Sequence, residues 1–361
     1  MANFIKNLIF RQYKKRVTKN HYLTYLFWEC TLRCNLSCLH CGSDCLKQSG
    51  ISDMPAEDFI KVLDNIKEKN PAKRMAVCIT GGEPLLRNDL ELVGKEICKR
   101  GFVWGIVTNG MLLTPERFSS LLNAGMGSLS FSLDGLEEQH TYLRQNPSSY
   151  KNVWNGIKMS VAVQEKIPNR LIFDVITCVH KNNIEILPKL REQLIQNGVK
   201  MWRIFTIFPS GRAAKNDLGL SKEEFVQVME FIWQTRKEFG NQIRVNYACE
   251  GWLGKYELKA RDYFYFCRGG INVGSVWCDG SVGACLSVRG KEFVQGNIYQ
   301  NDFDFMDIWN NRFKNMRDRS WTKHGKCKNC KQWKNCLGNG LHLYKDMTSE
   351  VAFCNYEYTL K

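Results

Sequence analysis

Short runs of β-branched and aromatic residues alternate with amphipathic stretches between residues 22 and 208. This alternation is typical of βα units that build a parallel sheet. The apolar runs predict six strands, at 22–30, 74–80, 102–108, 127–133, 171–178 and 201–207. The amphipathic stretches predict helices at 55–68, 89–100, 114–124, 151–165, 183–197 and 221–239.

Six βα units, against the eight of a closed TIM barrel, predict an α/β fold with an open, partial (β/α)6 TIM-like barrel. Polar and cysteine-containing segments follow the first four predicted strands, at 34–41, 81–84, 108–110 and 132–135. Parallel sheets carry their chemistry on the loops after the carboxyl ends of the strands. We therefore expect these four segments to meet at one rim.

The alternation of predicted strands and helices ends after residue 240, where a segment rich in cysteine, glycine and aromatic residues begins. The predicted organisation is a basic helix over 1–21, the barrel over 22–240 and a cysteine-rich extension over 241–361. Within the extension, residues 276–282 predict a hairpin around an Asp-Gly turn.

The chain has 16 cysteines among its 361 residues. It has no apolar stretch near the roughly 18 residues of a transmembrane helix and no signal-peptide pattern, so we expect a cytoplasmic protein. In a reducing compartment, cysteines at short spacings indicate metal or iron–sulfur ligation rather than disulfides. Cysteines inside predicted strands or helices are expected to be small buried apolar groups, namely Cys30, Cys78, Cys98 and Cys178. Cys45 has no assignment.

The formal net charge of +15 favours anionic partners such as an acidic peptide, a nucleic acid or a membrane surface. Part of this charge lies in residues 1–21, where apolar side chains are predicted to line one face of a helix: Phe4, Ile5, Leu8, Ile9 and Phe10. Such a helix either packs on the body of the protein or makes peripheral contact with a membrane.

Cys34, Cys38 and Cys41 form a C-x3-C-x2-C pattern on the first of the four loops. An iron–sulfur cubane normally takes four thiolates, so three local ligands leave one iron open. A zinc site is the alternative, but structural zinc sites are usually closed by four ligands.

This pattern after a first strand, with Gly-Gly-Glu-Pro at 81–84 after a second, resembles the radical S-adenosylmethionine (SAM) superfamily. The resemblance implies a [4Fe-4S] cluster on the three cysteines, whose open iron binds SAM. It implies that Gly81, Gly82 and Glu83 receive the SAM amino group, and that His40 lies near the adenine. It further implies that Asn109 lies near the ribose and that Ser132 and Arg144 hold the SAM carboxylate.

The extension resembles the SPASM domain, which holds auxiliary iron–sulfur clusters. The resemblance implies one complete auxiliary cluster on Cys327, Cys330, Cys336 and Cys354, with a zinc ribbon as the alternative. Cys267 and Cys285 match two ligands of the family's other auxiliary cluster, but the family's next cysteine falls at Gly340, so this site is a cluster with altered ligation, an incomplete cluster, or no cluster. Cys249 is the preferred third ligand of that cluster, and Cys278 is the other candidate.

The two resemblances imply an enzyme that splits SAM to a 5′-deoxyadenosyl radical and abstracts a hydrogen atom, most often from a peptide or small protein that it oxidises or cross-links. Flavodoxin or ferredoxin is the expected reductant, and the catalytic base is unidentified. The second interpretation of the sequence is a tetrapyrrole-modifying enzyme of the haem pathway. A metal-containing nucleic-acid-binding protein is the third, although it leaves the barrel motifs unexplained and no specific nucleic acid is expected as a partner.

Overall fold

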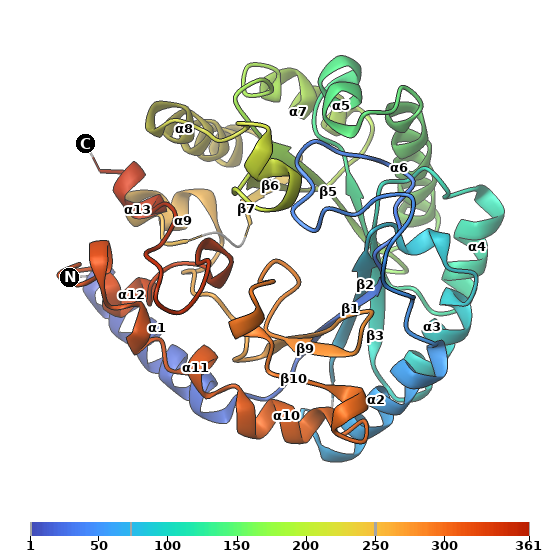
Figure 1. Cartoon of the computed structure of the whole chain (residues 1–361). Helices are drawn as coiled ribbons and strands as arrows, with labels where there is room; N and C mark the ends of the chain where they lie inside the picture. Colours follow the sequence, from blue (N-terminus) through green and yellow to red (C-terminus); the bar gives the residue numbers. More distant parts are fainter. Residues whose placement is uncertain (1, 73, 249–250, 361) are drawn as a thin grey trace.

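A ten-stranded mixed sheet forms the centre of the molecule in the computed structural model, which describes residues 2–72, 74–248 and 251–360 (Figure 1). The strand order is β10-β9-β8-β1-β2-β3-β4-β5-β6-β7. Strands β1 to β7 pair in parallel with their sequence neighbours, and β8 pairs in parallel with β1 on the other side. Their bounds are Tyr25–Thr31, Ala76–Gly81, Val103–Thr108, Ser128–Ser132, Ile172–Val179, Met201–Thr206, Arg244–Tyr247 and Val273–Val276.

The predicted open α/β barrel is confirmed, but its strand number is corrected. All six predicted strands are present as β1 to β6. The seventh parallel strand, β7, and the attachment of β8 to β1 were not predicted. The hairpin predicted in the extension is present as β8 and β9 (Ser281–Gly283), with Gly280 at φ +82° in its turn. Strand β10 (Gly296–Asn297) pairs antiparallel with β9.

Six long helices cover the outer face of the parallel strands (Figure 1). They are α2 (Ala56–Lys69), α3 (Leu90–Lys99), α4 (Pro115–Asn123), α6 (Ser149–Lys166), α7 (Leu187–Gln196) and α8 (Lys222–Glu238). Each one corresponds to a predicted helix. Helix α2 buries Phe59, whose ring stacks on Trp28 of β1 at 4.1 Å, so the apolar face packs directly on the sheet.

Polar side chains cap the N-termini of two of these helices, α4 and α8. Thr114 accepts a hydrogen bond from the backbone N–H of Arg117 at the start of α4. Ser221 and Glu224 form a reciprocal capping box at the start of α8. Helix α5 (Glu137–Arg144) was not predicted, because its sequence is mostly polar and charged.

The remaining helices are the N-terminal α1 (Ala2–Asn20) and short segments of the extension: α9 (Glu257–Ala260), α10 (Phe305–Arg312), α11 (Lys314–Arg317), α12 (Trp333–Cys336) and α13 (Asn355–Tyr358). Helix α1 lies beside α11 and α12 (Figure 1). Phe10 is buried against Trp252 and Phe266 of the extension. Lys14 Nζ donates to the carbonyl oxygens of Lys334 and Asn335, at 2.8 Å each.

The predicted packing of the N-terminal helix on the body of the protein is therefore confirmed. Ile5, Leu8 and Ile9 remain exposed, and nothing is described of the Phe4 side chain. Contact with a membrane stays a prediction. Among the described helices, none combines the length and apolarity needed to cross a bilayer.

The expected core cysteines divide into two kinds. Cys30 and Cys78 are buried, as predicted. The prediction is wrong for Cys98, which is exposed at the carboxyl end of α3. Cys178 is half-buried and faces polar neighbours, because it lies near the rim rather than in the apolar core.

Candidate functional site

The carboxyl ends of β1 to β4 surround a cavity of about 180 Å³. Every residue that the sequence assigned to the first cluster and to SAM lines this cavity, namely Cys34, Cys38, His40, Cys41, Gly81, Gly82, Glu83, Asn109, Ser132 and Arg144. Four loops that are far apart in the sequence therefore converge on one site. Cys45, Thr80, Val107 and Thr108 complete the lining.

Two glycines hold the second loop tightly against the segment that leads into Cys34. The backbone N–H of Gly82 donates to Thr31 O at 2.8 Å. A Cβ on Gly81, at φ +140°, would lie 2.1 Å from Thr31 O, and one on Gly82 would lie 2.0 Å from Arg33 O. A side chain at either position would therefore displace the cysteine loop.

Glu83 is buried and joins the second loop to the third. Its Oε1 accepts hydrogen bonds from Thr108 Oγ1 at 2.7 Å and from Leu85 N at 3.2 Å, and its Oε2 accepts from Asn109 N at 2.8 Å. Burial raises the pKa of Glu83 to about 7. A carboxylate has about four acceptor sites, so roughly one remains for a ligand.

Asn109 reaches across to the cysteine loop. Its Nδ2 donates to Asn35 Oδ1 at 2.8 Å and lies 3.9 Å from Cys34 Sγ. The side chain therefore supports the loop of the first cysteine as well as lining the cavity. Ser132 lines the cavity from the end of β4.

Arg144 is buried and aimed at Cys38. Its Nε donates to Asp134 Oδ2 at 2.6 Å, and its Nη1 lies 3.6 Å from Cys38 Sγ. Asp134 is fully buried and also accepts from Cys178 N at 2.9 Å. The sequence analysis did not select Asp134, although it stands in the loop after the fourth strand.

His40 lies next to this ion pair. One ligand atom each of His40, Asp134 and Cys178 lies within 4.8 Å of the others. Burial, together with the Arg144 charge, lowers the pKa of His40 to about 3, so its imidazole is neutral. Its Nδ1 is buried and has no hydrogen-bond partner among the described residues.

Cys45 belongs to the site, which its spacing did not indicate. It is buried, and its backbone N–H lies 3.4 Å from Cys41 Sγ. Hydrogen bonding from Cys45 lowers the pKa of Cys41 to about 5, against the effect of burial. Cys41 is therefore the readily ionised thiol of the three.

The donor set of this cavity fits a cluster with one open iron. Three thiols face it, two side-chain donors approach their sulfurs, and an unpartnered imidazole nitrogen and a carboxylate with spare acceptor capacity lie beside them. A fourth thiol is present in Cys45, but it hydrogen-bonds Cys41.

A second, smaller cavity of about 30 Å³ lies in the extension. Cys327, Cys330, Cys336 and Cys354 all line it, as the predicted ligand set requires. The backbone N–H of Asn339 lies 3.0 Å from Cys336 Sγ. Burial raises the pKa of Cys336 to about 12, and the neighbouring Cys354 and Cys327 thiols add to this effect. A bound metal centre would relieve that penalty, so the four thiols fit a fully coordinated cluster.

The third predicted group is only partly brought together. Cys267 and Cys285 are neighbours, since the Cys267 charge contributes to the raised pKa of Cys285 after burial. Cys249 lies outside the described residues. Cys278 lies elsewhere, with its Sγ 3.6 Å from Oε1 of the buried Glu29.

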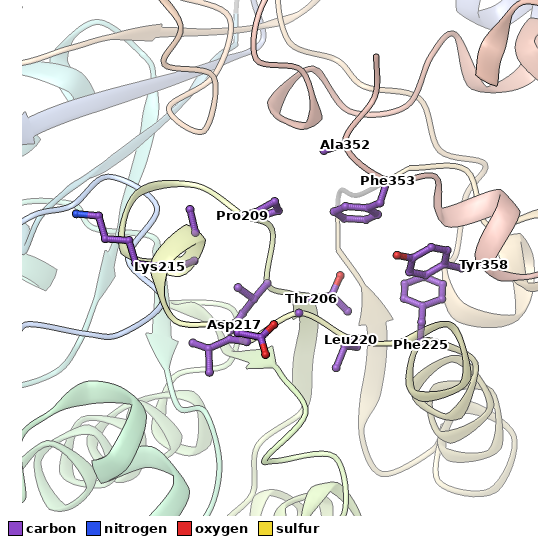
Figure 2. A pocket seen from close by; sticks show the side chains of 14 residues that line it. Thr206, Pro209, Lys215, Asp217, Leu220, Phe225, Ala352, Phe353 and Tyr358 are labelled. Carbon is purple, nitrogen blue, oxygen red and sulfur yellow. The ribbon is translucent and has the colours of Figure 1, made fainter. Parts of the chain in front are cut away.

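A pocket of about 380 Å³ opens between the carboxyl end of β6 and the end of the extension (Figure 2). Phe225, Phe353 and Tyr358 form an aromatic wall, and Lys215 lies on the loop at the opposite side. That loop also contacts the first site, because Arg212 Nε donates to Cys38 O at 2.8 Å. Phe353, on the other side of the pocket, directly precedes Cys354 of the second thiol-lined cavity.

Two family models match parts of the chain. The family model of the radical SAM superfamily matches residues 28–194, and that of an iron–sulfur cluster-binding domain, SPASM, matches residues 267–331. These domains imply a SAM-binding [4Fe-4S] cluster, SAM and auxiliary iron–sulfur clusters as cofactors.

Similar proteins differ in what they act on. An AdoMet-dependent heme synthase of Methanosarcina barkeri is 27% identical over 91% of this chain and 95% of its own length. The mycofactocin maturase MftC of Mycolicibacterium smegmatis is 27% identical over 87% of this chain and 76% of its own length. In fold, the chain resembles SuiB of Streptococcus suis, with a TM-score of 0.70, 18% identity, and coverage of 91% of this chain and 76% of SuiB.

Proposed function

Because the chain belongs to the radical SAM superfamily and carries a SPASM domain, we propose that it reductively cleaves SAM and removes a hydrogen atom from a peptide or small protein. The observation that carries the proposal is the convergence of Cys34, Cys38 and Cys41 with the three following loops on one cavity. The product is an oxidised or cross-linked peptide.

The residues of the first cavity have distinct tasks in this proposal. When bound, the cluster and SAM supply a 5′-deoxyadenosyl radical. Glu83 accepts a hydrogen bond from the methionine ammonium group through its remaining acceptor site. Arg144, whose orientation is held by Asp134, donates to the methionine carboxylate.

Three observations support a peptide as the substrate. The pocket of Figure 2 has a volume suited to a few side chains, and its aromatic wall suits an apolar residue. The net charge of +15 attracts acidic segments. MftC and a PqqA peptide cyclase are among the similar proteins.

The test combines this protein, reconstituted anaerobically, with each small protein encoded beside its gene, SAM and dithionite. We expect a substrate mass lower by two hydrogens and formation of 5′-deoxyadenosine. Phe353→Asp, which places a charge in the aromatic wall, should abolish modification but leave uncoupled SAM cleavage intact. SAM cleavage with no modified peptide from any neighbouring gene would contradict the peptide proposal alone.

An iron-containing tetrapyrrole is the second candidate substrate. Two observations favour it: the whole-length similarity to the heme synthase of M. barkeri and the similarity to its Fe-coproporphyrin III synthase, 24% identical over 86% of this chain. Incubation with Fe-coproporphyrin III, SAM and dithionite, followed by mass spectrometry, distinguishes the two. Conversion to haem would replace the peptide proposal.

A further inference from the structure

Cys267 and Cys285 form half of an iron–sulfur site that lacks the cysteine expected at position 340. The guanidinium of Arg319 and the backbone N–H groups of Leu341 and Gly269 surround the Cys267 thiol. Arg319 is itself buried. A buried cation and two amide donors around a thiol are features of a sulfur that carries negative charge.

The imidazole of His342 occupies the space beside Gly340. A Cβ on Gly340 would lie 2.5 Å from His342 Cε1 and 2.8 Å from its Nδ1. A cysteine at position 340 and the present position of His342 are therefore mutually exclusive. The ring lies where the missing side chain would project, within the short 3₁₀ turn Leu341–Leu343.

The same turn is attached to the half-site by hydrogen bonding. Leu341, next to His342, donates its backbone N–H to the Cys267 sulfur. Leu341 also shares a buried cluster with Ala284, which directly precedes Cys285, and both lie beside Gly269, where a Cβ would be 3.4 Å from Leu341 Cδ1 and 3.3 Å from Ala284 Cβ. His342 therefore adjoins a residue that packs in the same cluster as both cysteines.

His342 has a nitrogen available for a ligand. Its Nε2 is buried, and the described part of the chain offers it no hydrogen-bond partner. Such a group costs roughly 1–3 kcal/mol when left unsatisfied, so a buried orphan nitrogen calls for an explanation.

We propose that His342 Nε2 is the third protein ligand of an iron–sulfur cluster held by Cys267 and Cys285, in place of a cysteine at position 340. The nitrogen donates its lone pair to one iron, Nδ1 keeps its proton, and no bond is broken. This inference extends the proposed function by assigning a ligand of its auxiliary cofactor. Replacement of a thiolate by imidazole raises the reduction potential of a cluster, as in Rieske centres.

Phe208 connects the imidazole with the first site. The Phe208 ring packs on that of His342 with centroids 4.6 Å apart. A Cβ on Gly42, next to Cys41, would lie 3.6 Å from the same phenyl ring. Phe208 therefore lies between the His342 imidazole and the loop that carries Cys41.

The test uses the full-length protein with Cys34, Cys38 and Cys41 changed to Ala, so that only auxiliary clusters remain. We expect about eight irons per chain, and about four after His342→Ala is added. The dithionite-reduced protein should show a ¹⁴N hyperfine coupling in pulsed EPR that changes to ¹⁵N after labelling with ¹⁵N-histidine. His342→Cys should keep about eight irons, lose the coupling and lower the reduction potential.

His21→Ala is the matched control, because His21 precedes β1 at the opposite end of the strand from the cysteine loop; it should change neither iron content nor coupling. Two results would overturn the proposal: about four irons before His342 is changed, or about eight irons that survive His342→Ala without a histidine coupling. SAM cleavage by the protein with Cys34, Cys38 and Cys41 intact tests the proposed function separately, so the two failures are distinguishable.

Discussion

Asp134→Asn removes the buried partner of Arg144 and nearly preserves its shape. The asparagine retains an oxygen for the backbone N–H of Cys178, but it cannot neutralise the guanidinium 2.6 Å away. The substitution therefore leaves a buried, unpaired cation next to Cys38.

The expected loss of unfolding free energy can be calculated in two ways. Removing one partner of a buried ion pair costs about 3–5 kcal/mol. Burial alone would raise the pKa of Asp134, but Arg144 and the nearby histidines lower it from 3.8 to about 2. At about 1.4 kcal/mol per pKa unit, this corresponds to roughly 2 kcal/mol. The second figure is smaller because it leaves out the unpaired arginine, so we expect a loss of about 3 kcal/mol.

Urea unfolding of the apoprotein at pH 7 measures this loss. The pKa of Asp134 is depressed, so its contribution is present above about pH 4 and is lost only as the pH falls through about 2. Asp217→Asn is the matched control, since Asp217 pairs with Lys181 and its side chain is 95% exposed. The control should change the unfolding free energy by less than about 0.5 kcal/mol. Equal effects of the two substitutions would refute the reasoning.

Three further predictions follow from the same contacts. Gly82→Ala should lower the unfolding free energy by about 1–3 kcal/mol, because its Cβ would meet Arg33 O at 2.0 Å; an unchanged urea midpoint would show that the cysteine loop moves freely. Burial raises the pKa of Glu83 from 4.5 to about 7, so the unfolding free energy of the apoprotein should fall as the pH rises across that window. Glu83→Gln should flatten this pH dependence. If the slope is unaltered in the variant, another group causes the pH dependence. Cys330→Ala should cost about four irons per chain and Cys98→Ala none, and loss of zinc instead of iron would indicate a zinc ribbon.

The elements that were predicted correctly have strong local signals. Strands β1 to β6 are rich in β-branched and aromatic residues, and the helices between them have one apolar face. Strand β7, with the sequence Arg-Val-Asn-Tyr, is too short and polar to be recognised, and it forms because β6 provides a hydrogen-bonding edge. Strand β8 pairs with β1 across more than 240 residues of sequence, which local patterns do not encode.

The residues of the site likewise fall into those that local motifs predict and those that only the folded structure reveals. Cysteine spacing and Gly-Gly-Glu are contiguous motifs, and the cavity brings the predicted residues together. Asp134 and Cys45 were missed, because their roles depend on which side chains they meet. The role of His342 is likewise visible only once the chain is folded, since it lies two positions beyond residue 340, where a cysteine was expected.

Formation of 5′-deoxyadenosine from SAM tests the central claim most directly. The protein is reconstituted anaerobically with iron and sulfide, reduced with dithionite and compared with the variant in which Cys34, Cys38 and Cys41 are Ala. The account predicts 5′-deoxyadenosine from the unmodified protein only, and about four fewer irons in the variant. Zinc in place of iron, or no 5′-deoxyadenosine from a fully iron-loaded protein under any reductant, would contradict it.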